Sequence, residues 1–531
     1  MRTVVSLLAA LTASAGVPAA AGSLDAIDWW EGDVEAAFAT AREQDKPLFL
    51  YWGAVWCPPC NQIKKTIFTR REFQEKMKVF LPVYLDGDTE QAQVWGERLG
   101  AKGYPTMMVF SPQGEEVMRL PTGLQVAAFN QLLDEALGLM KPVAQVLDDA
   151  LGRGPVTDAA YRLLAYYSWG QDTAVNLTTA EREQAMAKLE AKVPAKLKRE
   201  KARLFALWLN AAISRSDDPE DEFALTDAQR EQADQRLRAI LADPERTMAT
   251  IEFVLYYAGG TVKALHPKSG PGRTRLVEAW ERTASRIEND SALSVDERLS
   301  ALVPALEFLQ LERGRNDLPP SFREHVAERV RWADDNAEDA FTRQATMSTA
   351  GWLLRQVGLD EEAHALYTAQ LEKAVSPHYF MSSLARLAKK DGDVDGAVGW
   401  LRKAYDSAEG RATRFQWGTN YLLGLIELTP KDAKTIEAES LRVFRQLVAM
   451  DDAFAGRNHK RAERLTKRFA DWNEGGKRAA YVNRIREAML PACAQLSDDA
   501  SGADGADRAP SMRSRCTEFF AELGSKPEET S

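Results

Sequence analysis

The stretch LFLYWGAVWCPPC, residues 48–60, joins an apolar run to two cysteines that lie three positions apart. Residues 48–52 are almost continuously apolar, which is typical of a strand buried on both faces of a sheet. We expect a helix to begin near Cys57, because Pro58 suits the first helical position, where no hydrogen-bonded N–H is needed. The stretch therefore predicts a strand–turn–helix unit, with Cys57 at the start of the helix and Cys60 one turn further on.

A Cys-x-x-Cys pair in this position indicates dithiol–disulfide chemistry. The helix dipole and the free N–H groups at the helix start favour the thiolate of Cys57, which is the species that attacks a disulfide. Cys60 can then attack the mixed disulfide and release the product. Pro58 and Pro59, the loop between the cysteines, both lack an N–H, so the N–H of Cys60 is the obvious donor left for the Cys57 sulfur. We therefore expect the pKa of Cys57 to be lowered only moderately from about 8.5.

Two alternatives for this pair are half of a zinc site and an inert structural disulfide. Zinc usually needs four Cys or His ligands, and the other two cysteines lie far along the chain. The five histidines are scattered, and we expect them to be exposed or hydrogen-bonded: His266, His325, His364, His378 and His459. The sequence favours a redox pair, with no metal and no cofactor besides the Cys57–Cys60 disulfide itself.

The segments around the cysteines alternate between helical and strand patterns. Helices are predicted at 33–44, 57–68, 89–99 and 126–139, and strands at 48–52, 79–85, 106–110 and 115–120. This order predicts an α/β domain with a mixed sheet, which we bound at residues 22–140.

Three short motifs resemble the thioredoxin superfamily: Lys46-Pro47, Trp56-Cys57-Pro58-Pro59-Cys60 and Gly103-Tyr104-Pro105-Thr106. The module is similar to the thioredoxin-like domains of bacterial thiol:disulfide interchange proteins. The resemblance implies that Pro105 follows a cis peptide bond and faces the cysteines. It also implies that the backbone of Tyr104 pairs with an extended substrate, and that Trp56 covers one side of the site. The implied substrate-binding residues are Trp56, Tyr104, Pro105 and Thr106.

The sequence departs from this family at a buried acid. Thioredoxins commonly have an aspartate six residues before the first cysteine, and here that position is Tyr51. The lysine that usually partners the aspartate corresponds to Tyr84. The carboxylate that would relay the proton of the second cysteine is therefore missing, and the sequence identifies no replacement.

After Pro142 the strand patterns nearly vanish, and helical periodicity continues to about residue 490. We predict a large all-α domain over residues 141–495. Gly351, Ala363 and Tyr367 recur 34 residues later as Ala385, Ala397 and Leu401, a spacing that resembles the tetratricopeptide repeat. The small residues would lie where paired helices cross closely. The alternative is an irregular helical array with one chance match.

Residues 496–531 are predicted to be a flexible tail with a short helix near Cys516 to Leu523. Cys493 and Cys516 flank its Ser-, Ala-, Asp- and Gly-rich part with 22 residues between them. We predict a structural disulfide between them, stabilising by roughly 3 kcal/mol in the chain-entropy model. A second redox pair is the alternative.

The N-terminus has the layout of a secretory signal peptide. Met1-Arg2 is positive, residues 4–17 are uncharged and mostly apolar, and Ala19-Ala20-Ala21 offers small residues for cleavage. We expect residues 1–21 to be removed; the alternative, a membrane anchor, would need a span of ~20 residues. No later stretch is apolar enough to cross a membrane. We expect an exported protein of the bacterial periplasm, where disulfides persist, with no transmembrane segment in the mature chain.

The composition bounds the possible partners. Apolar residues make up 45% of the chain and charged residues 27%, which is ordinary for a globular protein. Acidic residues outnumber basic ones, 78 against 68, which argues against nucleic-acid binding.

Two functions remain in competition. The first is an exported thiol–disulfide oxidoreductase that acts on protein thiol or disulfide clients, with an unidentified redox partner and a concave helical surface for binding. The second is a non-enzymatic protein-interaction scaffold in which the thioredoxin-like module is a docking unit. The intact pair Cys57 and Cys60 favours the first, while the direction of electron transfer stays open.

Overall fold

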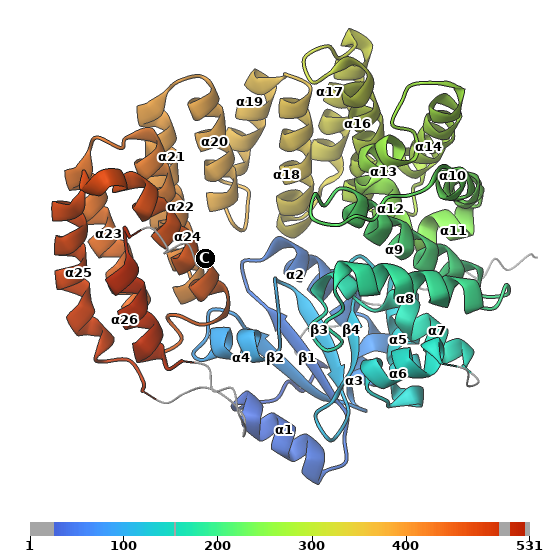
Figure 1. Ribbon diagram of the computed structural model, residues 1–531, viewed down its shortest axis with the longest axis horizontal. Coiled ribbons are helices and arrows are strands. Elements are labelled where there is room, and N and C mark those ends of the chain that lie inside the picture. The colour runs from blue at the N-terminus through green and yellow to red at the C-terminus, as the bar shows by residue number, and fades with distance from the viewer. Residues whose placement is uncertain (1–25, 153–155, 499–509, 526–531) are drawn as a thin grey trace, which may run out of the picture.

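The computed structural model describes residues 26–152, 156–498 and 510–525. Its sheet has four strands, β1 (Leu48–Gly53), β2 (Leu81–Asp86), β3 (Thr106–Phe110) and β4 (Glu116–Leu120), in the order β2-β1-β3-β4 (Figure 1). β1 runs parallel to β2 and antiparallel to β3, and β3 runs antiparallel to β4. The predicted mixed sheet is thus confirmed. All six residues of β1 are buried, because helices cover both faces of this central strand.

Alternate residues of β1 enter two different cores. Phe49 and Tyr51 pack with the helices that follow the cysteines, whereas Leu48, Leu50 and Trp52 pack on the opposite face. The helices of this domain are α1 (Val34–Glu43), α2 (Pro58–Ile63) with its π-helical continuation η2 (Lys64–Phe68), α3 (Arg71–Met77), α4 (Ala92–Arg98) and α5 (Val126–Leu139).

In this domain, two predicted elements begin two or more residues away from their observed start. The strand expected from residue 79 begins at Leu81, because residues 78–80 form the turn that ends α3. The helix expected from residue 89 begins at Ala92, because Gln91 has a left-handed backbone with φ 60°. α3 was missing from the prediction, since its seven residues are too few for a clear helical period.

After β4 and α5, every further regular element of the described chain is a helix, as predicted. The 3₁₀ turns are η3 (Trp169–Gln171) and η4 (Glu474–Gly476). The α-helices are α6 (Val143–Leu151), α7 (Asp158–Tyr166), α8 (Thr179–Lys192), α9 (Lys198–Ser216), α10 (Asp227–Ala242), α11 (Pro244–Ala249), α12 (Ile251–Tyr256), α13 (Ala258–Leu265), α14 (Pro271–Asn289), α15 (Val295–Ser300), α16 (Leu302–Arg313), α17 (Pro320–Asn336), α18 (Ala340–Gln356), α19 (Asp360–Gln370), α20 (His378–Lys390), α21 (Val394–Ser407), α22 (Arg411–Leu428), α23 (Ala433–Val448), α24 (Gly456–Trp472), α25 (Ala479–Cys493) and α26 (Met512–Glu522).

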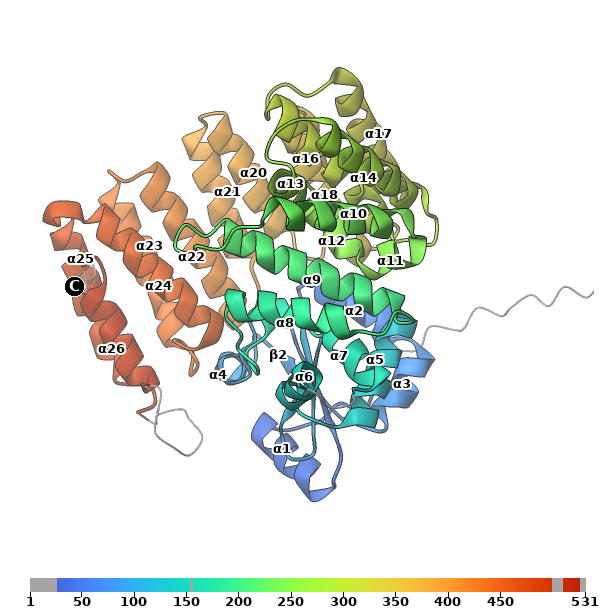
Figure 2. The same cartoon turned by 45° about the vertical axis from the view of Figure 1, so that its right-hand side comes forward.

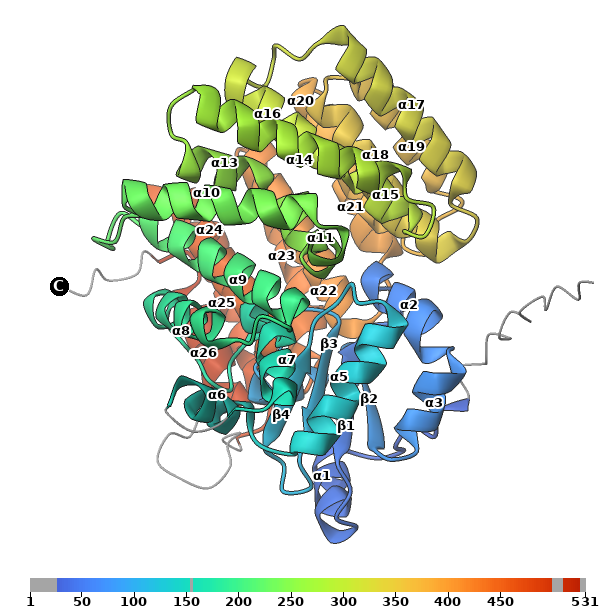
Figure 3. The ribbon, with the colours of Figure 1, turned by 90° about the vertical axis from the view of Figure 1, so that its right-hand side faces the viewer.

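These helices form an arch around one end of the sheet. The arch starts with α6 to α9 beside β4, passes above α2, and returns with α24 beside α4 (Figures 1, 2 and 3). α18 contacts α2 directly, and α24 contacts α4. The helical arch, which consists of helices α6 to α25, therefore faces the helix that carries the cysteines.

The segment in which the sequence suggested a repeat consists of the paired helices α18 with α19 and α20 with α21. Ala363 and Ala397 are fully buried. A Cβ on Gly351 would collide with the ring of Tyr367 in the neighbouring helix. The small residues thus permit close helix crossings, while the assignment to a particular repeat family stays a prediction.

The end of the described chain is a helix packed on the arch. α26 begins at Met512, four residues before the predicted start, because the side chain of Ser511 caps it. A disulfide joins Cys493 of α25 to Cys516 of α26. The predicted signal peptide, residues 1–21, and most of the predicted loop at 497–510 lie outside the described residues. Among the described helices, none combines the length and apolar character needed to cross a bilayer.

Candidate active site

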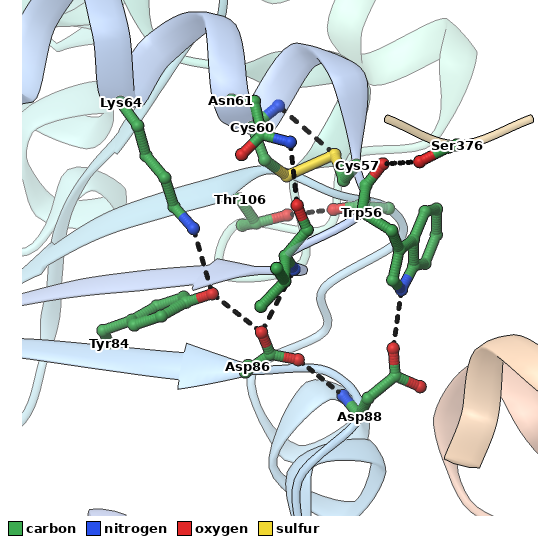
Figure 4. Close-up of a disulfide and its surroundings, with 12 residues drawn as sticks. Trp56, Cys57, Cys60, Asn61, Lys64, Tyr84, Asp86, Asp88, Thr106 and Ser376 are labelled. Atoms are coloured by element: carbon green, nitrogen blue, oxygen red, sulfur yellow. Dashed lines mark hydrogen bonds between the residues drawn. A yellow bond between two sulfur atoms is a disulfide. The ribbon is translucent and has the colours of Figure 1, made fainter. Parts of the chain in front are cut away.

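Cys57 and Cys60 form a disulfide at the start of α2, directly after β1 (Figure 4). Cys57 is the N-cap residue of α2, and its sulfur accepts a hydrogen bond of 3.2 Å from the backbone N–H of Cys60. This is the donor expected from a loop with two prolines. Cys57 is 3% exposed and Cys60 is completely buried, so Cys57 is the less buried of the two, and it alone lines the cavity described below.

The Tyr104–Pro105 peptide bond is cis, as predicted. The ring of Tyr104 packs against Trp52 and Trp56, with centroid distances of 4.3 and 5.8 Å. Thr106 is fully buried, and its hydroxyl donates a hydrogen bond of 2.7 Å to the carbonyl of Gly103 and lies 3.2 Å from the side-chain oxygen of Gln171. This hydrogen bonding fixes the turn that carries the cis bond.

Tyr51 and Tyr84 replace the acid and the lysine that the family resemblance led us to seek. They are paired across β1 and β2, and their rings stack at 5.1 Å. The alignment of Tyr84 with the family lysine is consistent with this pairing. Burial and the nearby Asp86 carboxylate raise the pKa of both phenols, so both stay neutral at physiological pH. Lys64 donates a hydrogen bond of 3.1 Å to the Tyr84 hydroxyl.

Asp86, at the carboxyl end of β2, is a site residue that the sequence reasoning missed. Its carboxylate accepts hydrogen bonds from the N–H of Val55 at 3.1 Å, the Tyr84 hydroxyl at 2.8 Å and the N–H of Asp88 at 2.9 Å. Asp86 thus ties the loop before Cys57 to the neighbouring strand. The sequence contained a signal for Asp86, because this residue ends a strand predicted to lie beside the strand that leads to Cys57. The carboxyl ends of parallel strands meet at one edge of a sheet.

Asp88 connects the same loop to the helical arch. Its carboxylate accepts hydrogen bonds from the indole N–H of Trp56 at 2.6 Å and from the N–H and hydroxyl of Thr413, both at 2.8 Å. The Ser376 hydroxyl donates a second bond across this boundary, 2.7 Å to the carbonyl of Trp56. Burial raises the pKa of Asp88. Trp56 is therefore held from both sides, by its side chain and by its backbone.

An aromatic group from the arch packs over Trp56. The ring centroid of Trp56 lies 6.4 Å from that of His378 and 6.1 Å from that of Tyr379. The rings of His378 and Tyr379 both pack against Trp417. Burial lowers the pKa of His378 to about 4. Among the described residues, neither of its ring nitrogens has a hydrogen-bond partner. The prediction of exposed or hydrogen-bonded histidines is therefore wrong for His378, which serves as a neutral ring in an aromatic contact.

A cavity of about 880 Å³ opens between the thioredoxin-like domain and the arch. Trp56, Cys57, Pro58, Pro59 and Tyr104 line it from the domain side. Residues of α12, α15 and α18 line it from the opposite side. Of the predicted substrate-binding residues, Pro105 and Thr106 are buried and do not line this cavity. The structure thus places the reactive pair at the wall of a chamber formed by both parts of the chain.

Comparisons with known proteins identify residues 34–137 as a thioredoxin-like domain. Over 85 residues, the chain is 29% identical to the thiol:disulfide interchange protein DsbD 1 of Pseudomonas aeruginosa. That match covers 16% of this chain and 14% of the relative's length. A solved structure titled DsbH oxidoreductase matches with 18% identity and a TM-score of 0.20, covering 24% of this chain and 96% of that one.

Proposed function

We propose that the protein is an exported thiol–disulfide oxidoreductase that exchanges its Cys57–Cys60 disulfide with protein clients. The observation that carries this proposal is the position of the pair at the start of α2, with Cys57 facing a cavity and Cys60 buried behind it. This arrangement gives the two sulfurs different roles, because only one of them lines the cavity.

The exchange is a reversible two-electron transfer. In one direction, the Cys57 thiolate attacks a client disulfide, forms a mixed disulfide and releases one client thiolate. The Cys60 thiolate then attacks the Cys57 sulfur, which restores the Cys57–Cys60 disulfide and releases the second client thiolate. The client gains the two electrons that the protein loses, and the thiolates take up or release protons from solvent. In the other direction, a client dithiol reduces the disulfide by the same steps.

The N–H of Cys60 supplies the local stabilisation of the Cys57 thiolate, together with the dipole of α2. Pro58 and Pro59 supply no N–H, so a strongly lowered Cys57 pKa is not expected. The neutral pair Tyr51 and Tyr84 beneath the site provides no carboxylate to accept the Cys60 proton.

Export to the periplasm and protein clients are parts of the same proposal. The signal-peptide layout of residues 1–21 supports export, and the disulfide between Cys493 and Cys516 supports an oxidising compartment. The printed name of the Pseudomonas aeruginosa relative, a thiol:disulfide interchange protein, supports exchange with thiols and disulfides. The arch, which already encloses the site, is the proposed partner-binding part.

A trapping experiment tests this function. Replacing Cys60 by serine removes the second attack, so Cys57 should retain clients as mixed disulfides that a reductant releases. The matched control replaces both Cys57 and Cys60 by serine and should retain none. Equal recovery from the two variants, with no exchange of the native protein on a small disulfide, would reject the proposal.

A further inference from the structure

We propose that the cavity beside Cys57 selects client segments that carry a cationic side chain close to the exchanging cysteine. This inference rests on the proposed function and adds the class of client. It is drawn from the cavity walls, which combine carboxylates without ion-pair partners and an unpartnered buried amide. A client that reaches Cys57 from this side enters the cavity, because Cys57 lines its wall and Cys60 does not.

The cavity has the dimensions of a binding site. Its volume of about 880 Å³ lies in the range of roughly 300–1,000 Å³ that ligand sites occupy. One wall carries Trp56, Cys57 and Pro59, and the opposite wall carries Tyr256 and Gln344 of the arch. Because the walls come from both parts of the chain, a segment bound to Cys57 also contacts the arch.

Carboxylates are concentrated on the wall formed by the arch. Glu252 of α12 and Asp296 of α15 line it, together with Glu297. Glu297 is engaged in its own helix cap, where it accepts hydrogen bonds from the N–H and hydroxyl of Ser294. Across the part of the chain that the structure covers, no Lys, Arg or His nitrogen lies within 4.0 Å of the other two carboxylates.

The two carboxylates differ in exposure: Asp296 is half-buried and Glu252 is exposed. Partial burial raises the pKa of Asp296, and Glu297 adds like charge beside it. The Thr349 hydroxyl donates one hydrogen bond of 2.9 Å to Asp296. Arg203 is the cation whose charge reaches Glu252, but its guanidinium donates to the carbonyls of Ala165 and Ala249. A guanidinium or ammonium group in the cavity would add a direct ion-pair partner for these carboxylates.

The cations that line the cavity are engaged elsewhere. The Arg457 guanidinium lies 4.3 Å from the ring of Tyr104 and donates a hydrogen bond to Gln416. Arg70 donates to the carbonyl of Thr66 in η2. Arg457 thus lies beside Tyr104 and Arg70 lies at the end of η2, whereas the carboxylates belong to α12 and α15.

Gln344 provides an independent indication of a ligand. This side chain lines the same cavity and is 1% exposed. Its oxygen accepts a hydrogen bond from the N–H of Ser376, whereas its amide nitrogen has no partner in the described part of the chain. A buried amide without a partner is costly, and a backbone carbonyl of a bound segment would satisfy it. Ser376 also holds the carbonyl of Trp56, so this donor is connected to the residue before Cys57.

The test measures the attack of Cys57 on two peptides. In a Cys60→Ser background, Cys57 attacks a peptide cysteine held as a mixed disulfide with pyridine-2-thiol, joins the peptide and releases the neutral thione, which is measured by absorbance. The two peptides differ only in having Arg or Glu two positions from the cysteine. We expect the Arg peptide to react about tenfold faster, which corresponds to about 1.4 kcal/mol.

Removing the two charges should remove this preference. With Glu252→Gln and Asp296→Asn, we expect the ratio of the two rates to fall to about two or less. The control variant, Glu361→Gln with Glu362→Gln on the exposed face of α19, should keep the tenfold ratio. Each single substitution should give an intermediate ratio, which preserves the test if the double variant does not fold.

Dithiodipyridine, a small neutral disulfide, separates the two levels of the proposal. It should react at the same rate with the Cys60→Ser protein and with its Glu361→Gln, Glu362→Gln control, because it carries no charge to select. If it reacts but the two peptides react equally, the selection by charge is wrong and the proposed function stands. A preference that survives in the double variant would also contradict the assignment to this cavity. If even dithiodipyridine does not react with Cys57, the function itself is wrong.

Discussion

The hydroxyl of Ser376 donates a hydrogen bond of 2.7 Å to the backbone carbonyl of Trp56, the residue directly before Cys57. This contact joins the helical arch to the loop that carries the reactive disulfide. Together with the bonds of Asp88 to Trp56 and Thr413, it means that the arch contributes contacts to the candidate site. The following predictions test this coupling, the stability of the arch and the chemistry.

Replacing Asp88 by alanine should destabilise the contact between domain and arch. The change leaves the indole N–H of Trp56 and both donors of Thr413 without their acceptor. We expect the free energy of unfolding in urea to fall by about 1–3 kcal/mol. The control is Glu90→Ala, an exposed carboxylate nearby, which should change it by less than about 0.5 kcal/mol. Equal effects of the two substitutions would show that Asp88 does not hold the contact.

Asp452 should make stability depend on pH. It is 3% exposed and accepts a hydrogen bond from the N–H of Gln93 in α4, yet burial raises its pKa to about 6. The usual value is about 3.9. Because the folded-state pKa is the higher one, the stabilisation is complete below about pH 4 and is lost as the pH rises through about 6. The free energy of unfolding should fall by at most about 3 kcal/mol over this pH range.

The substitution Asp452→Asn should remove this dependence. An asparagine keeps the acceptor for Gln93 but carries no charge, so the variant should gain in Tm over the native protein between about pH 4 and pH 6. Above about pH 6, the difference in Tm between the variant and the native protein should stay constant. Asp395→Asn, at an exposed position, serves as the control. Parallel pH profiles for Asp452→Asn and the native protein would contradict the role of Asp452.

The second disulfide should stabilise the end of the chain without taking part in exchange. Replacing Cys493 and Cys516 by alanine frees the loop between them and should lower the free energy of unfolding by roughly 3 kcal/mol. Amide hydrogen exchange in α26 should become faster, because this helix packs on the arch around Phe444 and Phe454. The rate of thiol–disulfide exchange at Cys57 should not change. A loss of that rate with α26 intact would indicate a redox role for the second pair.

Much of the domain could be predicted from the sequence because its signals are local. The bounds of β3 and α5 agree with the prediction, and so does the position of Cys57 as the residue before α2. The cis bond at Pro105 followed from the family resemblance. Local patterns carry this information, since an apolar run, a capping position or a proline reports on its own segment.

The enclosure of the site could not be predicted in the same way. The hydrogen bonds from Ser376 to Trp56 and from Thr413 to Asp88 join residues more than 300 positions apart. No periodic pattern in the sequence predicts them. Asp88 and Ser376 look like ordinary polar residues in the sequence. The buried, unpartnered ring of His378 likewise results from how the arch docks. Docking depends on the whole surface of both parts, so it emerges only in three dimensions.

The redox equilibrium of the Cys57–Cys60 pair with glutathione tests the central claim most directly. The protein would be equilibrated across glutathione buffers, its free thiols alkylated, and the oxidised fraction of the pair measured by mass. We predict a two-electron titration with a midpoint between about −270 and −120 mV, the range of dedicated thiol–disulfide proteins. A Cys57–Cys60 disulfide that stays fully oxidised in every buffer, without exchange, would contradict the account.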